Sequence, residues 1–111
     1  MFFSGDTGLT TEYREIRERL GPFDLTMLEV GAWHPSWGDM HLGPENALKA
    51  HALLGGAAFV PIHWGTYRRV GMRDDEPRRA AEEFRRAAAE HAPGVHVAIL
   101  EPGESLDVTT P

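Results

Sequence analysis

The sequence predicts an α/β fold, in which helices and strands alternate along the chain. Segments whose apolar residues recur every three or four positions alternate with short apolar runs, and Gly or Pro stands between them. The runs at residues 24–30 and 95–100 are apolar on both faces, which is typical of strands covered on both sides of a sheet. With 111 residues, the chain is expected to hold one domain or a piece of one.

The first predicted helix follows a glycine-rich loop at residues 5–8. Apolar residues recur at helical spacing from Tyr13 to Leu20, and the Gly-Pro pair that comes next ends the helix. Residues 24–30 form the strand after it. Too few residues precede the glycine-rich loop for a full strand to be expected there.

The middle of the chain predicts a second helix and a second strand. A loop rich in Gly, Trp and His spans residues 31–43. Pro44 then opens a helix that runs to about Leu54, because proline is tolerated at the first helical position. A Gly-Gly pair ends this helix, residues 57–63 form the strand, and a polar loop follows through Asp75.

The last third predicts one helix and two strands. The helix is marked by apolar residues on one stripe: Ala80, Ala81, Phe84, Ala87 and Ala88. Residues 95–100 form a strand, and Pro102-Gly103 turns the chain into a short final strand around residues 106–108. Because three helices can shield only one side of this sheet, we expect an apolar face that drives oligomerisation or instability.

Composition restricts the partners and the chemistry. Seventeen acidic residues against eleven basic ones give a net charge of −6, which argues against a general nucleic-acid binder. The chain has no Cys, so any metal must be held by His, carboxylate or water. No apolar run approaches the length of a transmembrane segment, and we expect a cytoplasmic location, free or peripheral to a membrane.

Asp6 is the first candidate metal ligand. It stands in the string FSGDTG, which begins at residue 3, and the flanking glycines allow the backbone to turn tightly around it. A carboxylate on a short loop after a strand can hold a cation. The alternative is an Asp that only caps a turn or a helix.

His63 is the second candidate. It follows a largely apolar run and begins the string HWGT, so it lies where a strand emerges into a loop, a position that favours function. The alternative is a satisfied histidine at a strand end.

These two strings resemble segments of the metallo-β-lactamase superfamily, in the branch that contains the N-acyl-phosphatidylethanolamine-hydrolysing phospholipase D. The resemblance implies that residues 1–111 are the C-terminal half of a four-layer αββα sandwich. It also implies a site for two zinc ions, with Asp6 bridging them and His63 as a terminal ligand of the second. The His-x-His-x-Asp-His run that supplies other ligands in the superfamily has no match in this sequence.

His41 is the third candidate, in a His-x-x-Pro-Glu-x-Ala pattern before the second helix. The resemblance implies a histidine over the metals that contacts the substrate's phosphate or a developing negative charge, so we assign His41 a catalytic role and no metal role. The alternative is a loop histidine bonded to backbone. His51, His91 and His96 are interpreted as structural, while His34 could line a pocket or lie at the surface.

Tryptophan side chains and departures from the family pattern bear on the substrate. Trp33, Trp37 and Trp64 could form an apolar wall, although packing under a loop is the simpler interpretation. The sequence departs from the family pattern at Leu9, Glu29, His34 and Gly38-Asp39.

The resemblance therefore implies a fragment of a zinc-dependent hydrolase that acts on a phosphodiester, including an N-acyl-phosphatidylethanolamine-like phospholipid, or on a related ester or lactone. By itself the fragment is expected to be inactive or barely active, and to need a complementary N-terminal half or a second copy of itself. Two other classes remain: a non-catalytic remnant or interaction module, and a small phosphate-binding module that uses the loop at residues 4–8.

Overall fold

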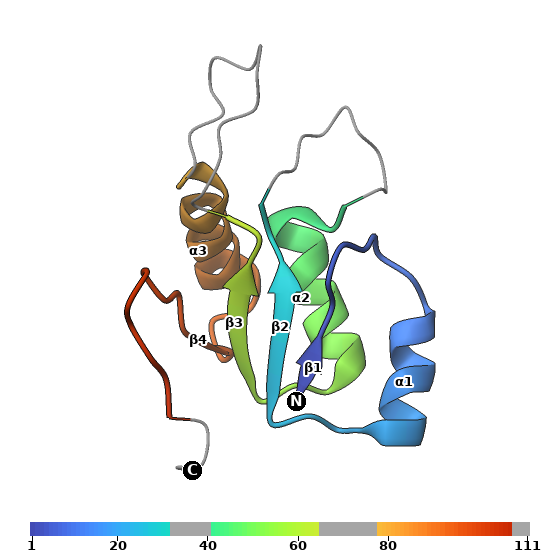
Figure 1. Cartoon of the computed structure of the whole chain (residues 1–111). Coiled ribbons are helices and arrows are strands. Elements are labelled where there is room, and N and C mark those ends of the chain that lie inside the picture. Colours follow the sequence, from blue (N-terminus) through green and yellow to red (C-terminus); the bar gives the residue numbers. More distant parts are fainter. Residues whose placement is uncertain (32–40, 65–77, 108–111) are drawn as a thin grey trace.

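All four strands of the sheet run parallel, in the order β1-β2-β3-β4, and the helices alternate with them along the chain (Figure 1). This arrangement comes from a computed structural model, which describes residues 1–31, 41–64 and 78–107. The strands are β1 (Phe2–Phe3), β2 (Leu25–Glu29), β3 (Ala58–Ile62) and β4 (His96–Val97). The α/β fold class predicted from the sequence is confirmed.

Three helices follow the predicted order, namely α1 (Glu12–Leu20), α2 (Gly43–Leu54) and α3 (Arg79–His91). Pro44 lies in the first turn of α2, and Gly55 ends that helix with a positive φ of 68°. Four residues of the predicted stripe are buried in α3, and the fifth, Ala80, is partly buried. Within the described ranges, none of these helices is long and apolar enough to cross a lipid bilayer.

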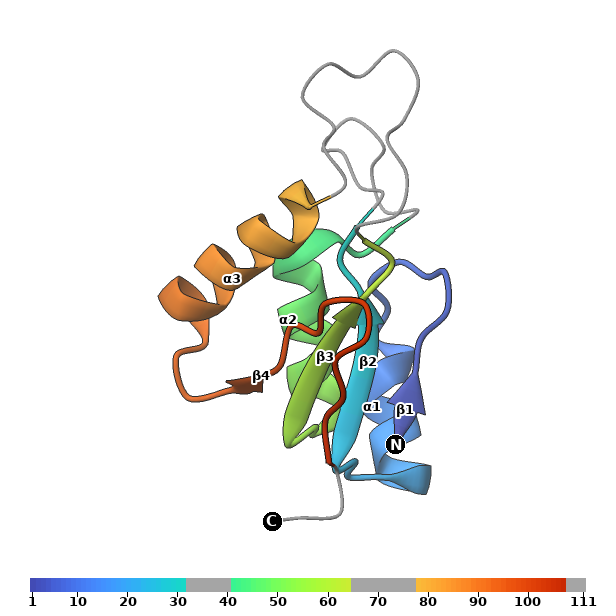
Figure 2. The same ribbon diagram turned by 60° about the vertical axis from the view of Figure 1, so that its left-hand side comes forward.

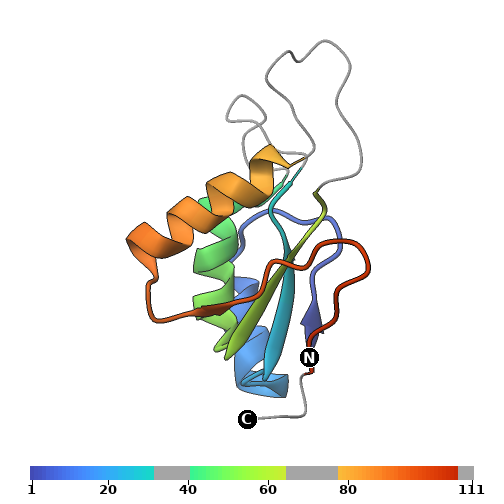
Figure 3. The ribbon, with the colours of Figure 1, turned by 90° about the vertical axis from the view of Figure 1, so that its left-hand side faces the viewer.

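The helices lie on one side of the sheet and form the core with it (Figure 3). Phe59 of β3 is fully buried and packs against Phe84 of α3, with 4.7 Å between the ring centroids. Thr26 of β2 is also fully buried and is hydrogen-bonded to His51 of α2 over 2.8 Å. Burial lowers the pKa of His51. The structural role predicted for His51 is confirmed.

The other face of the sheet is covered unevenly. Leu25 and Val60 are buried there, while Phe3 is 62% exposed. Residues 98–107 run along this side, opposite the helices (Figures 2 and 3). Exposure of this apolar face is therefore concentrated at β1, and the oligomerisation expected from it stays a prediction.

Strand lengths differ from the prediction at both ends of the chain. Phe2 and Phe3 suffice for a short strand because they pair with Thr26 and Met27 of β2. At the other end, β4 covers only two residues of the predicted 95–100. Beyond it, Ala98 donates one more backbone hydrogen bond to the carbonyl of Phe59, and a turn then leads the chain away.

The predicted final strand is wrong over residues 106 and 107, which form no strand, and residue 108 lies outside the described residues. The turn before it is closed by a hydrogen bond from the backbone N–H of Glu104 to the carbonyl of Glu101. The predicted turn at Pro102-Gly103 is thus present, but no strand partner follows it in the described sheet.

The parallel arrangement decides where the candidate site lies. The carboxyl ends of parallel strands meet at one edge of the sheet, which is where ligands bind in open α/β folds. Residues that follow β1, β2 and β3 therefore meet at this edge. They include Asp6, Gly31 and His63.

Candidate metal centre

The loop that carries Asp6 is hydrogen-bonded to β2 on both sides of Asp6. The backbone N–H of Ser4 donates to the carbonyl of Met27 over 2.9 Å, and the N–H of Thr7 donates to Oε1 of Glu29 over 3.1 Å. Between them, Gly5 adopts a φ of 58°, a conformation that glycine takes without a steric penalty. The Asp6 side chain is 74% exposed at the top of this loop.

Tyr13 of helix α1 is hydrogen-bonded to the same loop. The Tyr13 hydroxyl donates to Oγ1 of Thr7 over 3.0 Å and lies 3.3 Å from the carbonyl of Gly8. Tyr13 is 3% exposed, and this burial raises the pKa of its hydroxyl. The first helix therefore contributes a buried anchor for the Asp6 loop.

His63 leaves β3 with a strained backbone. Its φ is 67°, and among the described residues it is the one non-glycine residue with a positive φ. Such strain is found most often at functional sites. Nδ1 of the ring lies 3.0 Å from the carbonyl of Gly31, and because a carbonyl can only accept, Nδ1 carries the hydrogen. Nε2 is then the nitrogen with the lone pair.

Asp6 and His63 converge in space. Oδ1 of Asp6 lies 3.3 Å from Nε2 of His63. Two ligand atoms that each lie about 2.0–2.2 Å from one tetrahedral ion are roughly 3.3–3.6 Å apart, so this separation suits a shared cation. Metal-binding histidines also commonly donate their other ring N–H to a carbonyl, as His63 does. The donor set and its spacing thus fit a metal ion, while the metal role itself stays a prediction.

Glu29, at the end of β2, lies at this site although the sequence analysis does not assign it a site role. Its side chain is fully buried, and both carboxylate oxygens lie 3.1 Å from Nδ1 of His41. Oε1 also accepts a hydrogen bond from the backbone N–H of Leu42 over 3.0 Å. Its signal in the sequence is an acidic residue at the last position of an otherwise apolar strand.

His41 lies beside the Asp6 and His63 pair. Its ring stacks on that of His63 with 5.8 Å between centroids and 19° between planes, and its side chain is 19% exposed. The structure thus brings together all three site residues predicted from the sequence. One ligand atom each of Glu29, His41 and His63 also falls within a 4.8 Å cluster.

The other histidines and tryptophans lie elsewhere. His91 and His96 are exposed, and neither belongs to the cluster of Glu29, His41 and His63. Trp64 packs partly buried against the core and donates its indole N–H to the carbonyl of Pro61 over 3.1 Å. The predictions for Trp33, His34 and Trp37 lie outside the described residues.

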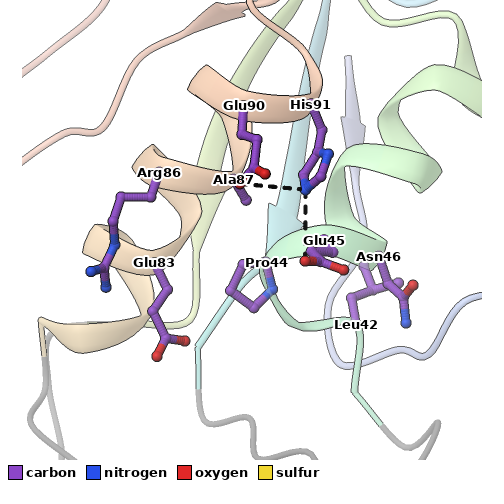
Figure 4. A pocket seen from close by; sticks show the side chains of 9 residues that line it. All are labelled: Leu42, Pro44, Glu45, Asn46, Glu83, Arg86, Ala87, Glu90 and His91. Carbon is purple, nitrogen blue, oxygen red and sulfur yellow. Dashed lines mark ion pairs between the residues drawn. The ribbon is translucent and has the colours of Figure 1, made fainter.

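A separate cleft of about 500 Å³ opens between the first turn of α2 and helix α3 (Figure 4). Its lining is mixed in charge and consists of Leu42, Pro44, Glu45, Asn46, Glu83, Arg86, Ala87, Glu90 and His91. Nε2 of His91 lies 3.8 Å from carboxylate oxygens of both Glu45 and Glu90. None of the three predicted site residues lines this cleft.

Comparison with known proteins gives a family match and several relatives. Residues 1–64 match the family described as the Beta-lactamase superfamily domain. The uncharacterized protein Rv0906 of Mycobacterium tuberculosis is 40% identical over 113 residues, which cover 99% of this chain and 29% of that protein. The N-acyl-phosphatidylethanolamine-hydrolyzing phospholipase D 1 of Caenorhabditis elegans is 42% identical over 69 residues, covering 60% of this chain and 19% of that protein.

A solved structure has the same fold. Igni18, described as a novel metallo hydrolase from the archaeon Ignicoccus hospitalis, superposes with a TM-score of 0.59 at 28% identity, over 93% of this chain and 38% of that one. The chain thus spans between 19% and 38% of the length of these three proteins. With the family match covering more than half of the chain, this protein belongs to the beta-lactamase superfamily.

Proposed function

We propose that this chain carries part of the zinc site of a metal-dependent hydrolase, with Asp6 and His63 as metal ligands and His41 as a substrate-contacting residue. The observation that supports this most directly is the 3.3 Å separation between Oδ1 of Asp6 and Nε2 of His63. These two residues are far apart in sequence, and their ligand atoms meet at the carboxyl edge of a parallel sheet.

Each residue has a distinct task in this proposal. Asp6 would hold the cations with an exposed carboxylate on a loop that β2 and α1 support. His63 would bind one cation with Nε2, since its Nδ1–H is committed to the Gly31 carbonyl. When bound, zinc lowers the pKa of a coordinated water and polarises the scissile ester. His41, stacked on His63, would contact the substrate beside the metals.

The proposed substrate is a phosphodiester, a phospholipid of the N-acyl-phosphatidylethanolamine type included, or a related ester or lactone. The similarity to the Caenorhabditis elegans phospholipase D supports the phospholipid, because that protein's name states such a substrate. Two ligands do not complete a dinuclear zinc site. Residues 1–111 would therefore act as a partial domain that hydrolyses little by itself and gains activity from a complementary N-terminal half or a second copy.

The phosphate-binding alternative is disfavoured by one contact. A phosphate in the loop at residues 4–8 would need free backbone N–H groups, but that of Thr7 already donates to the buried carboxylate of Glu29. The non-catalytic remnant differs from the hydrolase fragment in one respect, which is the ability to bind zinc.

Zinc titration by calorimetry tests the proposal, with the chain freed of metal beforehand. We expect saturable zinc binding that is lost in Asp6→Asn and in His63→Ala and retained in His96→Gln, a control that removes an exposed histidine elsewhere. Zinc binding unchanged in the Asp6→Asn/His63→Ala double variant would overturn the site. Hydrolysis of bis(4-nitrophenyl) phosphate then tests the activity, which is expected to be near background for the chain alone.

A further inference from the structure

Glu29 joins three segments that are separate in the sequence. Its carboxylate accepts hydrogen bonds from the backbone N–H of Thr7, on the Asp6 loop, and of Leu42, next to His41. It also bonds Nδ1 of His41 and lies 3.9 Å from Nδ1 of His63. A fully buried carboxylate is costly unless such donors satisfy it, so this set of bonds is specific to an acidic side chain.

From these contacts we infer that Glu29 is a positioning residue, which holds His41 in the Nδ1–H tautomer and in its place beside His63. Two backbone N–H groups already donate to Oε1, so the carboxylate acts as an acceptor and Nδ1 of His41 supplies the third hydrogen. A carboxylate beside an imidazole fixes tautomer and orientation in the same way in serine hydrolases. Nothing in the family match or in the relatives' names assigns this role.

The same atoms could be interpreted as a cation site, since Glu29, His41 and His63 form a compact cluster. The hydrogen-bond pattern favours the positioning role. A cation at Glu29 would have to displace two backbone N–H donors and the Nδ1–H of His41. It would also meet the Nδ1 of His63, which already carries a hydrogen for the Gly31 carbonyl. The groups around the Glu29 carboxylate are therefore hydrogen-bond donors, which suit an anion and not a cation.

The tautomer of His41 decides which hydrogen bonds its ring can make to a substrate. This step rests on the proposed function. With its hydrogen on Nδ1, the neutral ring presents Nε2 as an acceptor, pointing away from Glu29. That nitrogen can accept a hydrogen bond from a water or from a substrate hydroxyl.

Glu29→Gln tests this role directly, because the substitution keeps the shape of the side chain and changes only its hydrogen-bonding groups. Both carboxylate oxygens lie 3.1 Å from Nδ1 of His41, but Oε1 already accepts from the backbone N–H groups of Thr7 and Leu42, which occupy its two lone pairs. In the variant the amide oxygen keeps these two bonds, and the amide NH₂ replaces Oε2 and meets Nδ1 of His41 as a donor. We expect the preferred tautomer of His41 to reverse, with the hydrogen moving to Nε2, while the fold is kept. The exposed Glu18→Gln is the matched control.

The experiment is a long-range ¹H–¹⁵N correlation spectrum of the imidazoles, recorded on the metal-free chain at a pH where the rings are neutral. We expect His41 as the Nδ1–H tautomer in the wild type and in Glu18→Gln, and mostly as the Nε2–H tautomer in Glu29→Gln. His51, bonded to Thr26, should stay unchanged in all three and reports on the fold.

Two results would overturn the inference: a wild-type His41 that carries its hydrogen on Nε2, or a tautomer that is the same in Glu29→Gln. The wild-type spectrum decides the first even if the variant does not fold. Because neither metal nor substrate is present, the outcome is independent of the zinc titration, and a failed metal site is distinguished from a failed role for Glu29.

Discussion

The backbone of Gly31 lies directly against the carbonyl of His63. A Cβ built on Gly31 would come within 1.8 Å of that oxygen, well inside any contact that real Cβ atoms make. The carbonyl of Gly31 in turn accepts the Nδ1–H of His63. The end of β2 therefore shapes the loop that carries the proposed metal ligand, and it can do so only with glycine at this position.

We expect Gly31→Ala to disrupt the site. Since backbone atoms form the clash, the loss in free energy of unfolding should lie at the upper end of about 1–3 kcal/mol, the usual cost of overpacking. Thermal unfolding and zinc titration measure the two effects. Gly94→Ala is the matched control, because a Cβ at Gly94 meets nothing within 4 Å. Equal stability and zinc affinity in the two variants would contradict the tight approach.

The conformation of His63 predicts a difference between two variants that both lack the imidazole. His63→Ala keeps a Cβ at a φ of 67°, whereas His63→Gly does not. The left-handed conformation costs an L-residue roughly 1–2 kcal/mol, so His63→Gly should be the more stable variant by about that amount. Chemical denaturation of both measures it. A His63→Ala variant as stable as His63→Gly would show that the backbone relaxes without strain.

Zinc should stabilise the folded chain through the Asp6 site. A ligand that binds only the folded state adds about 2.7 kcal/mol at 100 times its Kd, so the melting temperature should rise with zinc concentration. Asp6→Asn should abolish this rise and leave the metal-free melting temperature almost unchanged, because the Asp6 side chain is 74% exposed. A rise of equal size in Asp6→Asn would place the zinc elsewhere.

Tyr13→Phe should loosen the Asp6 loop. The substitution removes the hydroxyl that donates to Thr7 and is expected to cost about 0.5–1.5 kcal/mol, the net value of a typical hydrogen bond. Thr7→Val removes the other partner of the same bond. In a double-mutant cycle on unfolding free energies, the two losses should therefore be less than additive. Strict additivity would show that the bond contributes nothing.

The buried His51 predicts a loss of stability in mild acid. Burial lowers its pKa below 6.5, so the unfolded chain binds the proton more readily than the folded one. The contribution of a neutral His51 is complete above pH 6.5 and decreases as the pH falls from 6.5 toward the folded-state value. His51→Asn should flatten the dependence of melting temperature on pH in this window, whereas the exposed His96→Gln should not. An unchanged slope in His51→Asn would assign the effect to another group.

Much of the fold was predictable because most helices and strands are marked by local sequence patterns. Helical spacing marked α1 and α3, proline and glycine delimited α2, and continuous apolar runs marked β2 and β3. The C-terminal strands were not predictable to the same degree. A short apolar run becomes a strand only if a partner edge is in reach, and beyond Ala98 the chain turns away from β3.

The amino-acid sequence alone determined the alternation of helices and strands, and it placed Asp6, His41 and His63 where strands and helices meet loops. Only the tertiary structure decided that a buried carboxylate at the end of β2 connects them. The partners of Glu29 lie 12, 13 and 22 residues away along the chain, and no local pattern encodes hydrogen bonds across such distances. They arise because parallel pairing aligns three strand ends at one edge, where a buried charge must find its donors.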